Sequence, residues 1–100
     1  MATRYVRAQS QMGRVGTTRY VMVPTSPAQL LTLNSGYQAL ELFVVGTGNL
    51  IWGDSNIAVN SGNYLWVGMN KIWDNLQDGW TVYLRADSIQ TLVSISEKYV

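Results

Sequence analysis

The sequence contains no cysteine and no histidine. Without cysteine it forms no disulfide, carries no thiolate nucleophile and offers no sulfur ligand to zinc or to an iron–sulfur cluster. Without histidine it also lacks the commonest general base and the commonest metal ligand. These two absences exclude most designs of hydrolase and metalloenzyme. We therefore expect a protein that is not an enzyme and that uses no cofactor and no metal ion.

Charge is scarce and unevenly distributed. Charged residues make up 13% of the 100 residues, and the net charge is +1, which is too small for a general nucleic-acid binder. No acidic residue precedes Glu41, whereas four arginines lie within the first 19 residues. Two interpretations are open: this basic segment pairs with an acidic neighbour such as another copy of the chain, or its arginines protect a soluble edge strand.

Long apolar runs are also missing. The longest runs, such as residues 42–45, have 4 residues, against about 20 for a membrane-spanning helix. Residues 1–24 lack the apolar stretch of a signal peptide because Arg and Gln recur throughout. We expect a soluble protein made in a cytoplasm, with no membrane and no nucleic acid among its partners.

Alternation of apolar and polar residues predicts short β-strands. In residues 79–85, Trp80, Val82 and Leu84 share one face, and residues 37–45 and 89–95 alternate in the same way. The segments between the strands, at 46–49, 53–56, 60–63 and 78–79, are rich in Gly, Asn, Asp and Ser, which favour turns. This spacing indicates an all-β protein with an antiparallel β-sandwich or jelly-roll-like body.

Residues 70–77 are the one candidate for a helix. Ile72, Trp73 and Leu76 stand at helical spacing, but the segment is short and an Asp-Gly turn signal follows it. We interpret it as a loop or a single turn in which Trp73 covers one end of the core.

Two short sequences occur twice in the chain. Residues 3–6 (TRYV) recur as residues 18–21, and residues 48–52 (GNLIW) are echoed by residues 62–66 (GNYLW). The first repeat predicts two edge strands, at about 2–8 and 14–23. Pro24 and Pro27 then interrupt the pattern, because proline cannot donate to a central ladder. We expect an extended N-terminal arm or edge strands over residues 1–27 and a compact β-sandwich body over residues 28–100.

The glycines and aspartates suggest turns more than chemistry. Gly46 and Gly48 resemble part of a nucleotide loop, but the third glycine, the following helix and the βαβ context are missing, which favours a hairpin turn. The aspartates lie in or beside turns, where local backbone bonding is favoured over catalysis or calcium binding. They are Asp54, Asp74, Asp78 and Asp87.

Two groups of aromatic residues are candidates for binding. The tryptophans could stack on a sugar ring, but burial in the core or at a subunit interface is favoured for Trp52, Trp66, Trp73 and Trp80. Near the N-terminus, arginines alternate with tyrosines, as on nucleic-acid surfaces. The acidic body disfavours nucleic acid, and arginine pairs well with protein carboxylates. We therefore predict that the partner-binding residues are Arg4, Tyr5, Arg7, Arg14, Arg19 and Tyr20.

The order of turns and strands resembles small structural proteins of tailed bacteriophages. The resemblance rests on residues 45–55 (VGTGNLIWGDS), 60–62 (NSG) and 79–86 (GWTVYLRA), and it covers about residues 37–96. It implies a β-sandwich or jelly-roll subunit of the virion, most plausibly a head decoration (cement) protein, and it carries over no catalytic residue. The implied partners are further copies of the chain, with a trimer favoured, and the major capsid protein or other virion subunits. The implied location is the virion, after synthesis in the host bacterial cytoplasm.

Two other functions stay open at this point. A carbohydrate- or host-surface-binding β-sandwich module would expose tryptophan to its ligand. A head–tail or tail adaptor subunit would differ from a decoration protein mainly in the ring that it joins.

Overall fold

The alternating segments of the sequence form eight β-strands. The computed structural model describes residues 16–99 of the chain, and within this range no helix is present that could cross a membrane. The strands are β1 (Thr17–Val23), β2 (Gln29–Thr32), β3 (Ala39–Thr47), β4 (Leu50–Gly53), β5 (Asn63–Leu65), β6 (Asn70–Trp73), β7 (Thr81–Ala86) and β8 (Thr91–Lys98).

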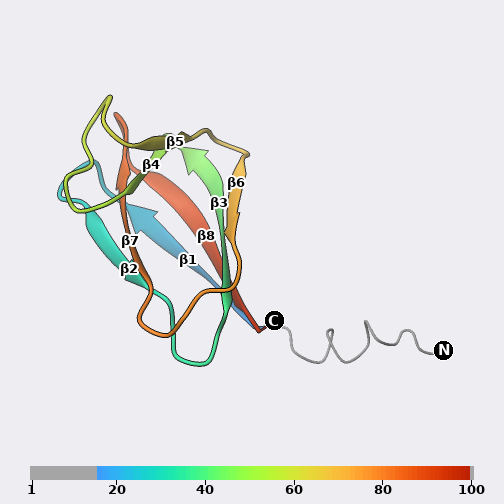
Figure 1. Cartoon of the computed structure of the whole chain (residues 1–100). Helices are drawn as coiled ribbons and strands as arrows, with labels where there is room; N and C mark the ends of the chain where they lie inside the picture. Colours follow the sequence, from blue (N-terminus) through green and yellow to red (C-terminus); the bar gives the residue numbers. More distant parts are fainter. Residues whose placement is uncertain (1–15, 100) are drawn as a thin grey trace.

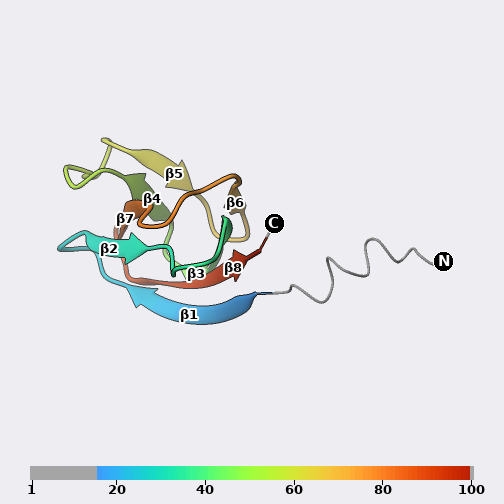
Figure 2. The same ribbon diagram turned by 60° about the horizontal axis from the view of Figure 1, so that its bottom comes forward.

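The strands form two antiparallel four-stranded sheets (Figure 1). Sheet A has the order β1-β8-β3-β6, and sheet B has the order β2-β7-β4-β5. Figure 2 shows β1, β8 and β3 running together on one side of the molecule, with the strands of sheet B on the other. Buried apolar residues from both sheets join in one core cluster. The all-β prediction is therefore confirmed.

The connectivity follows one rule: β1 pairs with β8, β2 with β7, β3 with β6 and β4 with β5. The second half of the chain thus runs back along the first as a single long hairpin, whose tip is the connection 54–62. This hairpin is folded over on itself, because β8 also pairs with β3 and β7 also pairs with β4. The folding-over divides the ribbon into two sheets and leaves β1 and β2 at their edges.

The core lies where the period-two pattern predicts it. On β3, Leu40, Leu42 and Val44 are fully buried, and on β7, Val82 and Leu84 are buried. Each such strand packs its apolar face inward because burying that face removes it from water.

The last strand is displaced from its predicted limits. It begins at Thr91 rather than at residue 89 and continues to Lys98, and Ile89 is half exposed. The predicted phase is nevertheless correct, since Val93 and Ile95 are buried on the inward face. The same phase brings Glu97 inward, where it is also fully buried.

The turn predicted before β7 is present. Gly79 has a φ of +87°, which glycine adopts without steric cost, and the Trp80 amide donates to the Gln77 carbonyl at 3.1 Å.

The prediction of a loop or single turn over residues 70–77 is wrong for its first half. Residues 70–73 form β6, which pairs with β3 in the register Leu40 to Trp73. Pairing with the edge of the long strand β3 satisfies the backbone amides of this segment. A helix this short would not be stable on its own. Trp73 does pack against the core, as expected.

The predicted edge strand at 14–23 corresponds to β1, which lies at the edge of sheet A. It pairs with β8 along all 7 of its residues, and its last residue, Val23, is fully buried. The turn after it is joined to sheet B, because the Ala86 amide donates to the Pro24 carbonyl at 2.8 Å. Residues 16–27 of the predicted arm are therefore an edge strand and a turn within the two-sheet structure. The predicted strand at 2–8 lies outside the described residues.

Candidate binding surfaces

Two of the six predicted partner-binding residues lie in the described part of the chain, both on β1. Tyr20 projects from the outward side of sheet A and is 65% exposed. Arg19, its neighbour, lies on the opposite side of the strand and is half-buried. The other four, Arg4, Tyr5, Arg7 and Arg14, lie outside the described residues.

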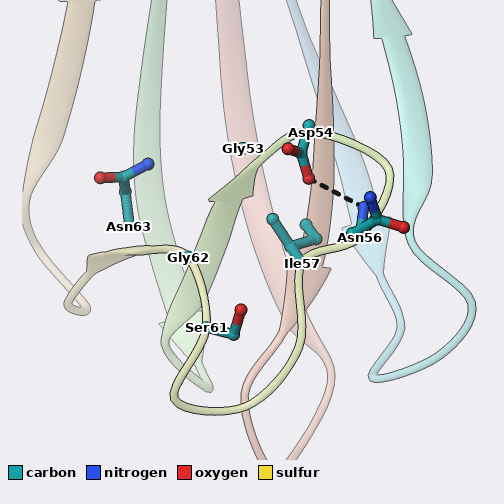
Figure 3. Close-up of a pocket in the computed structure, with 7 residues that line it drawn as sticks. All are labelled: Gly53, Asp54, Asn56, Ile57, Ser61, Gly62 and Asn63. Atoms are coloured by element: carbon teal, nitrogen blue, oxygen red, sulfur yellow. Dashed lines mark hydrogen bonds between the residues drawn. The ribbon is translucent and has the colours of Figure 1, made fainter.

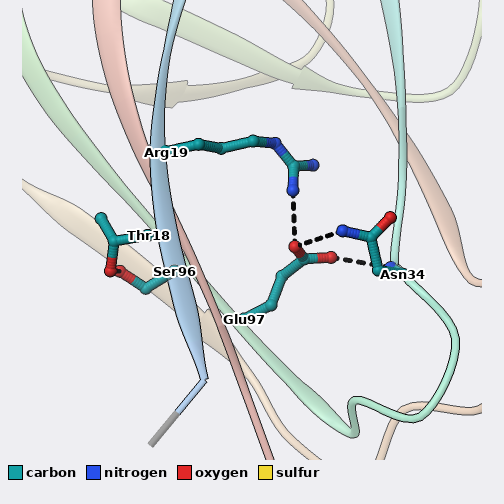
Figure 4. A network of polar contacts seen from close by, with 5 residues as sticks. All are labelled: Thr18, Arg19, Asn34, Ser96 and Glu97. Atoms are coloured by element: carbon teal, nitrogen blue, oxygen red, sulfur yellow. Dashed lines mark hydrogen bonds and ion pairs between the residues drawn. The ribbon is translucent and has the colours of Figure 1, made fainter.

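Arg19 forms an ion pair within its own chain. Its Nη1 lies 2.5 Å from Oε1 of Glu97 on β8 (Figure 4). The Asn34 side-chain amide donates to the same oxygen at 2.8 Å, and the Asn34 backbone N–H donates to Oε2 at 2.7 Å. The Glu97 side chain is fully buried, whereas that of Arg19 is 38% exposed.

This network has a structural cause. A buried carboxylate is tolerated only when it is paired and hydrogen-bonded, because removing it from water is costly. Both oxygens of Glu97 have donors, so the charge is compensated by Arg19 and Asn34. No chemical motif in the sequence indicates this site; the one signal is that the inward phase of β8 continues to position 97.

The outward side of sheet A carries a row of large apolar residues. The register places Tyr20 and Phe43 on either side of Ser94, and Met22 beside Leu92. Ile72 follows on β6, opposite Glu41. Tyr20, Met22, Phe43 and Ile72 are 65%, 51%, 40% and 50% exposed. We call these four residues, with Leu92, the outer face of sheet A.

Three of the four tryptophans converge on one place. Trp52 at the end of β4, Trp73 at the end of β6 and Trp80 before β7 form what we call the tryptophan cluster. The ring centroids of Trp52 and Trp73 are 5.0 Å apart at an interplanar angle of 87°, and those of Trp73 and Trp80 are 5.0 Å apart at 51°. Lys71 Nζ lies 5.5 Å from the centroids of both Trp52 and Trp73.

The tryptophan cluster lies between core and surface. Its three members are partly buried and pack against the core, as the sequence favoured, and they also line a cavity of about 470 Å³. Trp66 differs: it is 51% exposed, and its ring lies 5.4 Å from that of Tyr64. The sequence did not predict that Trp52, Trp73 and Trp80 converge while Trp66 stays apart, because convergence depends on which strands become neighbours.

A second cavity, of about 290 Å³, lies under the hairpin tip (Figure 3). Asp54 begins this tip and accepts a hydrogen bond from the Asn56 backbone N–H at 2.9 Å, the local bonding expected of a turn aspartate. Ile57 is buried here, and Ile51 beneath it is fully buried although it lies on the outward side of sheet B. The tip therefore covers one part of that sheet.

Asp78 and Asp87 bond to groups that are distant in sequence, rather than to their local backbone. Asp78 Oδ1 accepts from the Gly36 backbone N–H at 3.1 Å, which joins two loops distant in sequence, and Asp87 Oδ1 lies 3.4 Å from the Tyr64 hydroxyl. Within residues 16–99 no group of three or more acidic side chains is placed to hold a metal ion.

The predicted hairpin turn at residues 46–49 is wrong: Gly46 and Thr47 end β3 and pair with β8, and only residues 48–49 form the connection that follows. It carries the chain from β3 in sheet A to β4 in sheet B, and these two strands are not paired. Gly48 passes so close to the neighbouring connection that a Cβ built on it would lie 2.1 Å from the Ile89 carbonyl oxygen. Tight crossing between sheets, rather than a hairpin, explains this glycine.

The fold and these surfaces define an all-β protein of two antiparallel four-stranded sheets, with an exposed apolar sheet face and a partly buried tryptophan cluster. Comparison with known protein families and with curated protein sequences finds no match to this chain.

Proposed function

We propose that the protein is a non-enzymatic structural subunit of a virion, a capsid decoration protein that binds and stabilises the head lattice of a tailed bacteriophage. The observation that carries this proposal is the outer face of sheet A, where both edge strands and the central strand β3 leave large apolar side chains in solvent. Contiguous exposed apolar surface on a soluble protein marks a site of interaction.

The proposed function goes with a specific type of two-sheet fold, the jelly roll. The strand orders β1-β8-β3-β6 and β2-β7-β4-β5 support an eight-stranded β-sandwich of the jelly-roll type, in which one long hairpin is rolled into two sheets. Jelly rolls occur among viral capsid and lectin domains. This is an analogy of fold and does not by itself assign a function.

Residues 1–27 would extend the contacts between subunits, as an N-terminal arm or as edge strands. Among the described residues, β1 has a paired strand on one side only, and a free edge accepts an extended segment from a neighbour. Residues 18–21 of β1 repeat residues 3–6, so a neighbouring copy carries a second segment with the sequence of an edge strand. Repetition on a lattice would turn weak contacts of this kind into firm attachment.

The decisive test is the mass of the purified protein in solution, measured by light scattering over a range of concentrations. We expect an oligomer, with a trimer favoured, and we expect Phe43→Lys on the outer face of sheet A to convert it to a monomer. Leu30→Lys is the matched control, because Leu30 is 56% exposed on β2 of the other sheet. A monomer at every concentration, or equal effects of the two variants, would contradict assembly through this face.

A head–tail or tail adaptor subunit would use the same surfaces, and electron microscopy of labelled particles would separate the two by the position of the label. Carbohydrate binding would use a different part of the molecule, the tryptophan cluster.

A further inference from the structure

We propose that the tryptophan cluster is a binding site for a neutral saccharide. The cavity beside it is lined by Trp52, Trp73 and Trp80 and has polar side chains at its rim, including Asp54 and Ser55. This site does not depend on assembly, because none of its residues belongs to the outer face of sheet A.

The aromatic rings are held in place before any ligand arrives. They come from both sheets, from β4, β6 and the start of β7, and they pack against the core on one side. Edge-to-face contact between Trp52 and Trp73 and the ammonium group of Lys71 near both rings restrict their rotation. A ligand that meets fixed rings loses less free energy to ordering of the site.

Hydrogen-bonding groups surround the rings. Only Oδ1 of Asp54 is used by the turn, where it accepts from Asn56, so Oδ2 can accept from a ligand. Within residues 16–99, no internal hydrogen bond engages the hydroxyl groups of Ser55 and Tyr83, and both residues are among those that line the cavity. A largely apolar cavity with a few converging polar groups is the usual composition of a small-ligand site.

The charged groups near the cavity disfavour charged ligands. A cation is disfavoured, because Lys71 already places its ammonium group 5.5 Å from two of the ring centroids. An anion is disfavoured by the Asp54 carboxylate at the rim. A purely apolar ligand would leave the rim groups without partners. A pyranose ring has an apolar C–H face to lie on an indole and a hydroxyl edge to meet acceptors and donors, which matches this arrangement.

The test is titration of the full chain with maltotriose, cellotriose and triacetylchitotriose, followed by tryptophan fluorescence and by saturation-transfer NMR. We expect saturable quenching and transfer to the bound sugar ring for at least one of the three. No transfer to any of them at millimolar concentration would overturn the proposal.

Three variants locate the site. Tyr83→Phe keeps the ring and removes one hydroxyl, so we expect affinity to fall by about two- to tenfold, the range of one hydrogen bond. Trp52→Phe should weaken binding at least as much, with circular dichroism and Tm measured to confirm that it folds. Trp66→Phe is the control: affinity should stay unchanged while the fractional quenching rises, because only the cluster then fluoresces.

Two results would overturn this location. Loss of binding in Trp66→Phe would place the ligand on the exposed Tyr64 and Trp66 rings instead. If the dye 8-anilinonaphthalenesulfonate binds and none of the saccharides does, the cavity is only a hydrophobic surface. Neither result bears on the proposed function in assembly, because that function is tested by the mass of the protein in solution.

Discussion

Arg19 and Glu97 are paired diagonally across the neighbouring strands β1 and β8. In the register of β1 and β8, Glu97 lies opposite Thr17, two residues before Arg19. The Arg19 side chain reaches along the strand to place Nη1 2.5 Å from the buried carboxylate. The residue predicted to bind a partner is thus also required within its own chain.

Removal of this arginine should destabilise the fold. In Arg19→Met, Glu97 would keep only the two donors of Asn34, and we expect the free energy of unfolding to fall by about 2–3 kcal/mol. This is less than for a fully buried pair because Arg19 is partly exposed. Urea denaturation at pH 7 measures the loss. Arg85→Met is the matched control, because Arg85 is also half-buried and has no ion pair among the described residues. Equal losses in the two variants would contradict the pairing.

Replacement of Thr91 should stabilise the fold, in contrast to replacement of Arg19. It is fully buried in β8, and its hydroxyl oxygen is the one buried side-chain polar atom within residues 16–99 that has no hydrogen-bond partner. Thr91→Val replaces the hydroxyl by a methyl group of similar size, so we expect the free energy of unfolding to rise by about 1 kcal/mol. Thermal unfolding followed by circular dichroism measures it. A lower Tm in Thr91→Val than in Thr91→Ser would show that the hydroxyl is satisfied.

Gly48 should tolerate no side chain. Its Cβ would meet the backbone carbonyl of Ile89, which cannot rotate away, so we expect Gly48→Ala to cost about 3 kcal/mol or more, as overpacking does. Gly36→Ala is the comparison, because Gly36 has a φ of +91° and no atom within 4 Å of its Cβ position. That variant should cost only the backbone strain, about 1–2 kcal/mol. The proposal of a close crossing fails if Gly36→Ala is the more damaging change in chemical denaturation.

The Tyr64 hydroxyl group forms one of the hydrogen bonds that hold the hairpin tip. The Asn60 backbone N–H donates to the Tyr64 hydroxyl at 2.9 Å. In Tyr64→Phe this bond is lost, and we expect the Asn60 amide to exchange its hydrogen faster while global stability falls by no more than about 1 kcal/mol. Hydrogen exchange followed by NMR tests this. Unchanged exchange at Asn60, with Tyr83→Phe as the reference, would mean that the Tyr64 hydroxyl does not protect this amide.

The sequence predicted the parts of the fold that depend on local pattern. The alternation in residues 37–45 predicts a strand with one apolar face, which requires no knowledge of its neighbours, and Leu40, Leu42 and Val44 on that face are buried. Residues 70–73 are wrongly interpreted as a loop or single turn, because the segment is short and precedes a turn signal, whereas pairing with β3 makes them a strand.

The features that the sequence did not predict depend on contacts between distant strands. Glu97 is a charged residue near the end of the chain, and only its pairing with β1 and its contact with Asn34 explain its burial. The tryptophan cluster likewise arises because β4 and β6 end close to the point where β7 begins. Tertiary registers of this kind leave no trace in local composition.

The nested pairing of the strands also predicts the order in which they pair during folding. The hydrogen bond from Asn63 to Trp52, between β4 and β5, joins residues 11 positions apart, whereas that between Thr18 and Ser96 joins residues 78 positions apart. Closing the longer loop from the open chain costs about 2 kcal/mol more in entropy. We expect folding to begin at the hairpin tip and to end with β1, which would also be the first strand to detach. The strand that carries Tyr20 and the arginine pairing to Glu97 is therefore the one a neighbouring copy could exchange most readily.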